Sequence, residues 1–227
     1  MRFHLPLHLS RKRNLINLYL FEKDWQMAIN QIECHPRECQ IWSSQVGFFI
    51  GDHESRVLPI HIACSLHAPL EVVIAIVEAN PSCLSAEENS LLQLPIHIAC
   101  KFGAPVDVIE YLARKNVAGT MEPDVMSRLP IHYACSNGAP EAVRALLRVN
   151  SASTLCKDCK GWLPLHVAVS SASATMKTKK PSTTLKFSEK VQAKNRKEVI
   201  EMLKCAMVAE TNDKRQYSSL RRVSKAA

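Results

Sequence analysis

Histidine and cysteine recur at fixed positions in this 227-residue sequence, and both side chains can bind metals or take part in catalysis. They lie in the motif Leu-Pro-Ile-His-x-Ala-Cys, with Tyr as x in the third copy, which begins at Leu58, Leu94 and Leu129. A fourth copy, Leu-Pro-Leu-His-Val-Ala-Val, begins at Leu163. The leading leucines are 36, 35 and 34 residues apart, and a repeat of this period is typical of a stacked array of helical units.

The motif histidines are His61, His97, His132 and His166. Packed helices lie ~8–10 Å apart, whereas protein ligands lie only about 2 Å from a zinc ion. Because successive histidines would be too far apart to share one ion, we predict that they are structural and bond loop backbone. The motif cysteines are likewise interpreted as small core residues.

Cys156 and Cys159 form a Cys-x-x-Cys pair, a spacing found in zinc and redox sites. The sequence has no second pair at the spacing that such a zinc site needs, so we interpret this pair as structural or incidental. It also lacks a glycine-rich phosphate loop and a convincing Ser/His/Asp set. We therefore predict no catalytic residues, no metal and no cofactor. Disulfides are not expected, and a reducing, intracellular compartment, cytoplasmic or nuclear, is predicted.

The formal net charge of +8 is concentrated at the two ends of the chain. Residues 1–13 carry four basic and no acidic side chains, and residues 171–227 carry fourteen basic and five acidic ones. We expect a basic flexible N-terminus at 1–13, a basic inserted loop at 171–195 and a basic flexible tail at 210–227. No apolar run reaches the 18 residues of a membrane-span candidate.

Every repeat predicts two helices. The Leu-Pro pair begins the first, because proline is tolerated at a first helical position. An acidic residue then marks the first turn of a second, apolar-striped helix. The first helices are expected to end near His67, Gly103 and Gly138. The first-turn acids of the second helices are Glu71, Asp107 and Glu141. The second helices are expected to close, in the left-handed conformation, at Asn80, Asn116 and Asn150.

These signals divide the chain into repeats at 57–93, 94–128, 129–162 and 163–209, with the loop 171–195 inserted in the last. Residues 14–56 precede them. Trp25, Ala28, Ile29 and Ile32 follow helical spacing there, which predicts an N-terminal helical cap. A long connection follows at 34–57, in which the strand-like run 47–52 predicts a finger hairpin.

The Pro-[Ile/Leu]-His-x-Ala core, the glycine that follows the aligned cysteine by three residues, the acidic start of the second helix and the period together resemble the ankyrin repeat. Residues 158–166 resemble that family's hairpin and helix start most closely. The resemblance implies an all-α solenoid of helix pairs with short hairpin loops, about four repeats plus the cap, and protein binding without catalysis. Leucine stands where the family usually has the threonine whose hydroxyl bonds the motif histidine, so the imidazole needs another partner here.

The resemblance places a binding surface on the first helices and the hairpin tips, and we expect a monomer that binds a partner protein there. The first-helix candidates are Ile62, Ser65, Leu66, Ile98, Lys101, Phe102, Tyr133, Ser136 and Asn137. The tip candidates are Glu87, Glu88, Glu122, Asp124, Lys157 and Lys160, whose charge changes sign along the array. Phe102 and Tyr133 are the expected anchors, because aromatic residues are enriched at interface hot spots.

The basic region 171–227 leaves an alternative function open, in which the chain binds nucleic acid or another acidic surface; we favour the protein partner. Phosphate-dominated binding would weaken steeply with salt. Lysines 177, 179 and 180, with the basic residues of 194–197, resemble a two-part nuclear import signal. Arg221 and Arg222 precede Ser224 as in a basophilic kinase site, so Ser224 is a candidate phosphosite.

Overall fold

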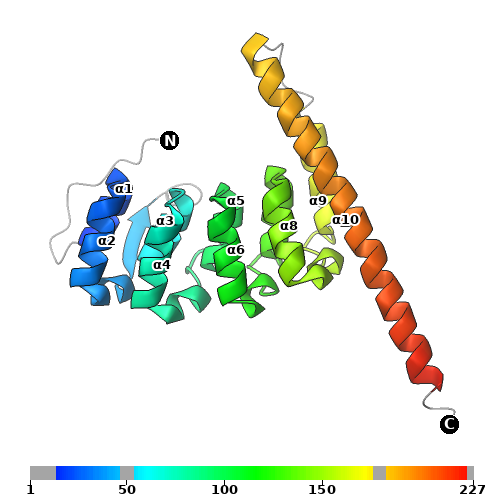
Figure 1. The fold of residues 1–227 in the computed structure, drawn as a ribbon, viewed down its shortest axis with the longest axis horizontal. Coiled ribbons are helices and arrows are strands. Elements are labelled where there is room, and N and C mark those ends of the chain that lie inside the picture. Colours follow the sequence, from blue (N-terminus) through cyan, green and yellow to red (C-terminus); the bar gives the residue numbers. More distant parts are fainter. Residues whose placement is uncertain (1–13, 47–53, 176–182, 224–227) are drawn as a thin grey trace.

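The computed structural model describes residues 14–46, 54–175 and 183–223, and Figure 1 shows their helices standing side by side along one row. Successive inner helices pack on one another, and so do successive outer helices. The predicted all-α solenoid of helix pairs is confirmed. The inner and outer helices pair as α1 (Leu15–Glu22) with α2 (Trp25–Cys34), α3 (Pro59–Ser65) with α4 (Leu70–Ala79), α5 (Pro95–Phe102) with α6 (Val106–Lys115), α7 (Pro130–Asn137) with α8 (Pro140–Val149), and α9 (Pro164–Thr175) with α10 (Thr183–Val223).

Proline stands at the start of α3, α5, α7 and α9, as predicted. The inner helices end where the sequence indicated. Gly103 and Gly138 follow α5 and α7 in the left-handed conformation, with φ of 75° and 62°. His67 adopts the same conformation after α3, with φ of 59°, although it carries a side chain.

The outer helices α4, α6 and α8 carry their acidic residue in the first turn and bury the predicted apolar stripe. Asn80, Asn116 and Asn150 follow the ends of these helices as predicted, but the left-handed conformation expected for them was wrong, because their φ angles are −147°, −131° and −153°. An extended residue leads the chain into a short 3-10 helix, namely η2 (Pro81–Ser85), η3 (Ala118–Thr120) or η4 (Ser151–Leu155). It also lets the Asn80 and Asn116 amides donate to carbonyls of the preceding unit, Cys39 at 3.1 Å and Leu84 at 2.9 Å.

The N-terminal pair α1–α2 stacks on α3 and α4 and buries Ile16, Leu20, Ala28 and Ile32. It continues through η1 (Pro36–Gln40) into the antiparallel strands β1 (Ser43–Val46) and β2 (Glu54–Val57), with Ser43 opposite Val57. A finger hairpin is thus present in the long connection. The run 47–52, predicted to be strand-like, lies outside the described residues.

The C-terminal region differs most from the sequence expectation. We expected a loop at 171–195 and a flexible tail from 210, yet α9 continues to Thr175 and α10 is a 41-residue helix ending at Val223. Figure 1 shows α10 extending past the array in both directions. The physical reason is that no glycine or proline occurs from residue 182 to 227. Met207 also replaces the asparagine that caps α4, α6 and α8, so these helix-stopping signals are absent from this segment.

Among the described residues, none of the helices is both long and apolar enough to cross a membrane.

Candidate functional site

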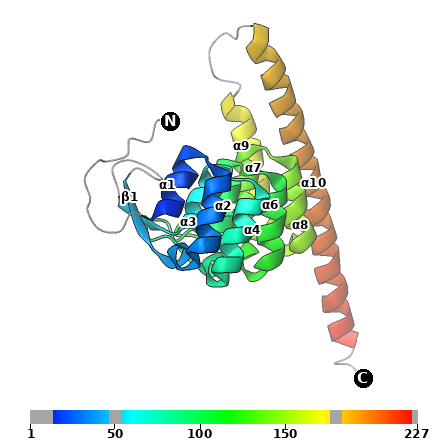
Figure 2. The ribbon, with the colours of Figure 1, turned by 60° about the vertical axis from the view of Figure 1, so that its left-hand side comes forward.

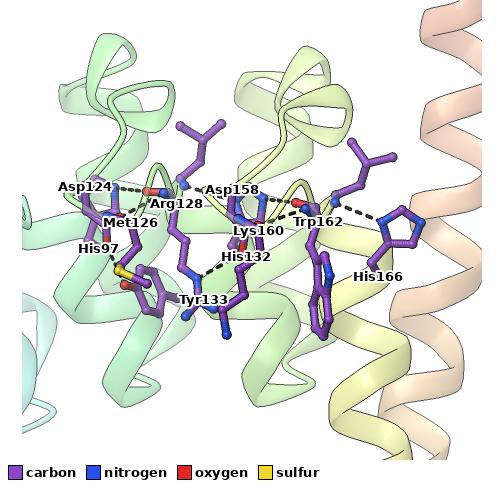
Figure 3. A network of polar contacts seen from close by, with 12 residues as sticks. His97, Asp124, Met126, Arg128, His132, Tyr133, Asp158, Lys160, Trp162 and His166 are labelled. Atoms are coloured by element: carbon purple, nitrogen blue, oxygen red, sulfur yellow. Dashed lines mark hydrogen bonds and ion pairs between the residues drawn. The ribbon is translucent and has the colours of Figure 1, made fainter.

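The motif histidines of α3, α5 and α7 connect their helices to the loop of the following unit, and Figure 3 shows this for His97 and His132. The Nδ1 atom of His97 accepts a hydrogen bond from the backbone N–H of Leu94 at 3.2 Å, and its Nε2 donates to the carbonyl of Arg128 at 3.1 Å. This fixes the neutral tautomer with the proton on Nε2. The backbone N–H replaces the threonine hydroxyl that the sequence lacks.

The other two interior histidines repeat this arrangement. The Nδ1 atom of His61 accepts a hydrogen bond from the backbone N–H of Leu58 at 3.0 Å, and its Nε2 bonds the carbonyl of Ala86 at 3.0 Å. His132 bonds the carbonyl of Trp162 at 3.3 Å. Burial lowers the pKa of His61 and of His97 to about 4. Hydrogen bonds to backbone, and for His97 above all the charge of Asp124, oppose this more weakly. The prediction that these histidines are structural and bond loop backbone is confirmed.

Three loops project from the array, and we name them finger 1 (87–93), finger 2 (122–128) and finger 3 (157–162). A buried acid organises each finger by accepting backbone N–H groups. Asp124 accepts from Met126 at 2.8 Å and Arg128 at 2.9 Å. The equivalent acids, each five or six residues before Leu-Pro, are Glu88 and Asp158. Two of the tip candidates, Glu88 and Asp124, are therefore buried turn anchors rather than exposed charges.

Neighbouring fingers are also bonded to one another. The backbone N–H of Val125 in finger 2 donates to the carbonyl of Leu91 in finger 1 at 3.0 Å. In the same way, the backbone N–H of Cys159 in finger 3 donates to the carbonyl of Met126 in finger 2 at 2.9 Å. Strand β2 joins the same row, because the backbone N–H of Arg56 donates to Oδ1 of Asn89 at 2.5 Å. The fingers and the hairpin thus form one continuous row.

The structure places Tyr133 inside this row, not on the surface as expected. Its hydroxyl donates to Oδ2 of Asp124 at 2.5 Å and accepts from the amide of Gln93 at 2.7 Å. Burial raises the pKa of Tyr133 well above its usual value, and Asp124 raises it further. Burial alone would raise the pKa of Asp124, but the hydrogen bonds from Tyr133 and Gln93 help bring it below its usual value.

Two further first-helix candidates, Ile62 and Ile98, are also fully buried. The physical reason is that α3 and α5 are each covered by an inner helix on both sides. Position x of the motif therefore packs into the core at these repeats.

Lys101 and Phe102 remain partly exposed on the inner face. The Lys101 ammonium lies 5.9 Å from the ring centre of Phe102 and 5.8 Å from that of Tyr133, and it donates to Oε1 of Gln93 at 3.2 Å. The Arg128 guanidinium lies 5.8 Å from the same Tyr133 ring. Burial lowers the pKa of Lys101, against the attraction of Glu88 and Asp124. We call Lys101, Phe102, Arg128 and the underlying Tyr133 the Lys101 cluster.

The remaining first-helix candidates divide between capping and surface positions. Asn137 is exposed, but its amide donates to the carbonyls of Cys100 at 2.7 Å and Lys101 at 2.9 Å, so it caps α5. Ser136 is exposed, whereas Ser65 and Leu66 are half-buried. Glu87, Glu122, Lys157 and Lys160 are exposed at the finger tips.

Sequence reasoning missed three residues of this surface: Arg128, Trp42 and Trp162. The two tryptophans are 38% and 39% exposed. Trp162 and Arg128 occupy the position directly before Leu-Pro, and this shared register was an available signal. Trp42 lies just before β1, where no repeat pattern marks it.

Five cysteine thiols are buried and four are partly or fully exposed. Burial raises the pKa of Cys39 and Cys83 to about 12. Cys156 is half-buried and Cys159 exposed on finger 3. Among the described residues, no group of three or more histidine, cysteine or acidic side chains is placed to hold a metal ion.

The predicted basic motifs are only partly described. Lys194 and Lys197 are exposed on α10, whereas Arg196 is half-buried and its stem covers Gly138 at the end of α7. The lysines of 177–180 and Ser224 lie outside the described residues. The import signal and the phosphosite stay predictions.

Stacked helix pairs, joined by histidine-to-loop bonds and projecting fingers, define a helical repeat protein. Residues 96–178 match the family model of ankyrin repeats, which describes three copies, and this match supports an ankyrin-repeat protein. None of the curated proteins compared with it matches the sequence. Ankyrin repeats are generally protein–protein interaction modules, and proteins built from them are typically non-enzymatic.

Proposed function

We propose that this protein is a non-enzymatic scaffold that binds a segment of a partner protein along the inner helices and fingers. The Lys101 cluster carries the proposal. A half-buried aromatic ring and two cations lie together at the middle of the array, held by Gln93, Asp124 and Tyr133 underneath. Such a pre-ordered aromatic and cationic surface loses little side-chain entropy when a partner covers it.

The exposed charges along the fingers support an extended contact. Glu87 and Glu122 are exposed on fingers 1 and 2, and Lys157 and Lys160 on finger 3. A partner segment whose charge changes from basic to acidic along its length would complement this row. Complementary charge mainly increases the association rate and fixes the orientation of binding.

Quantitative affinity capture tests the proposal by comparing the wild type with Lys101→Ala/Phe102→Ala. Tyr133 is left intact because its removal would disturb the buried network. A hot-spot pair should lose roughly 30-fold in affinity, which corresponds to about 2 kcal/mol. Tyr111→Ala/Lys115→Ala is the matched control, since Lys115 lies 5.7 Å from the half-buried Tyr111 ring on the outer helix α6 of the same unit.

The control pair should retain the captured partners at wild-type yield. Equal yields from the wild type and both double variants, with all three folded by circular dichroism, would refute the inner-face assignment. Equal losses from the two variants would also refute it, because the effect would then not be specific to the inner face.

A further inference from the structure

The last inner helix, α9, exposes positions that every preceding repeat buries. The motif histidines of α3, α5 and α7 are fully buried, whereas His166 is exposed. The motif cysteines are at most 2% exposed, whereas Val169 at the same position is 50% exposed. No inner helix follows α9 among the described residues. The side of α9 that the next inner helix would cover therefore has no inner helix of the described residues packed against it.

At the same end, the described part of the chain contains no finger after finger 3. In each interior repeat, Nε2 of the histidine bonds a carbonyl of the next finger or of the chain leading into it. His166 accepts from Leu163 at 3.1 Å through Nδ1, but its Nε2 has no such acceptor in the described part of the chain. Leu91 and Met126 each receive an N–H from the next finger, and no described finger follows Lys160, which holds the equivalent place in finger 3.

The continuation of α10 explains the missing finger. In α4, α6 and α8 the capping asparagine stands nine residues after the first-turn acid, and a 3-10 helix and a finger follow. In α10 the acid is Glu198 and the corresponding position is Met207, beyond which the helix continues to Val223. The chain segment that would have formed a fourth finger over His166 is helical instead.

We propose that this open end, formed by Lys160, Trp162, His166 and Val169, docks an extended segment of a partner protein in the place of the missing finger. A backbone carbonyl of the segment accepts from Nε2 of His166, and a backbone N–H donates to the carbonyl of Lys160. An apolar side chain packs on Val169 and the exposed face of Trp162.

The three filled interfaces of the array define the chemistry of this occupant. At each of them a loop of the next unit presents a backbone carbonyl to the histidine of the preceding unit. Fingers 2 and 3 also donate a backbone N–H to the preceding finger. Lys157 and Lys160 are exposed beside the open position, so an acidic segment is favoured over a basic one. This surface shares no residue with the Lys101 cluster, although Lys157 and Lys160 also belong to the finger row of the proposed function. The two proposals are tested by different variants, so failure of one is distinguishable from failure of the other.

A peptide copying residues 121–137, which contains finger 2 and α7, is a suitable probe because it fills the equivalent position in the intact array. It is titrated into the full-length, nitrogen-15-labelled protein. The imidazole signals of His166 and the indole N–H signal of Trp162 should shift saturably. The indole of Trp42, equally exposed at the other end of the row, should not move.

Val169→Lys should weaken peptide binding roughly fivefold or more, because it places an ammonium on the apolar contact. Val117→Lys is the matched control: Val117 is also 50% exposed but follows the outer helix α6, and its variant should bind as the wild type does. Unchanged signals of Trp162 and His166 at millimolar peptide would overturn the proposal. Equal affinities for the two valine variants, or equal shifts of both tryptophans, would overturn it as well.

Discussion

Acidification from pH 7 to 4.5 should remove a large part of the stability of this fold through two buried histidines. Burial lowers the pKa of His61 and of His97 to about 4, while in the unfolded chain a histidine titrates near its ordinary value of about 6.5. The folded state therefore favours the neutral rings. Their contribution is fully present above the unfolded pKa and is lost as the pH falls from there toward the folded pKa.

The magnitude follows from proton linkage. Between pH 6 and 5 the unfolded chain binds nearly one more proton per histidine than the folded protein does, so each ring costs about 1.2 kcal/mol over that pH unit. Over the full change to pH 4.5 the loss is about 2.5 kcal/mol for each ring and about 5 kcal/mol for both. This is comparable with the whole free energy of unfolding of many domains, about 5–15 kcal/mol. His132, whose pKa burial also lowers, adds to it.

Urea unfolding followed by far-ultraviolet circular dichroism at half-unit pH steps measures this loss. His97→Gln is the informative variant, because glutamine does not titrate. Whatever its absolute stability, the slope of its unfolding free energy against pH should fall by about one proton between pH 6 and 5. Asp124 and Asp158, whose carboxyl pKa values are lowered, lose their contribution only at lower pH. Identical slopes for the wild type and the variant would refute the reasoning.

Gly138→Ala should destabilise the protein by about 2 kcal/mol or more in urea unfolding, because an added Cβ would lie 2.7 Å from Cγ of Arg196 at a φ of +62°. Gly161→Ala has the same type of backbone but open space around it, and should cost only about 1 kcal/mol. Tyr133→Phe should lower the free energy of unfolding by about 1–3 kcal/mol in the same assay, because buried Asp124 and Gln93 would lose their hydrogen bonds to the Tyr133 hydroxyl. A thiol reagent followed by mass spectrometry should label the exposed cysteines rapidly and the five buried ones only on unfolding, because burial blocks access and raises thiol pKa. The exposed cysteines are Cys34, Cys159 and Cys205, and the buried ones are Cys39, Cys64, Cys83, Cys100 and Cys135.

Much of the fold followed from local patterns. The Leu-Pro pairs, the glycines after the inner helices and the apolar stripes of the outer helices each depend on a few neighbouring residues, and the structure bears them out. The structural role of the histidines also followed, because the helix spacing of any stacked array excludes a shared ion. The asparagines were misjudged because their extended backbone serves a hydrogen bond to the preceding unit, at Cys39 for Asn80 and at Leu84 for Asn116.

The candidate surface was predicted less well, for a related reason. Tyr133 and Asp124 have the residue types of a binding surface, yet they bond each other and Gln93 across two units. Residues 31 and 40 positions apart in the chain meet there, and no local pattern encodes such a meeting. Trp162 and Arg128, which remain at least partly exposed, were hidden among loop residues.

The sequence by itself determined the repeat, its helix pairs and the places where the inner helices begin and end, because these depend on backbone preferences within a few residues. Only the tertiary structure decided which side chains of a repeat reach solvent, because that depends on whether another unit follows. The same motif position is buried at Cys135 and half exposed at Val169. The difference arises because α10 continues as a helix where the earlier units form a finger, so no finger or inner helix of the described residues covers this end of the array.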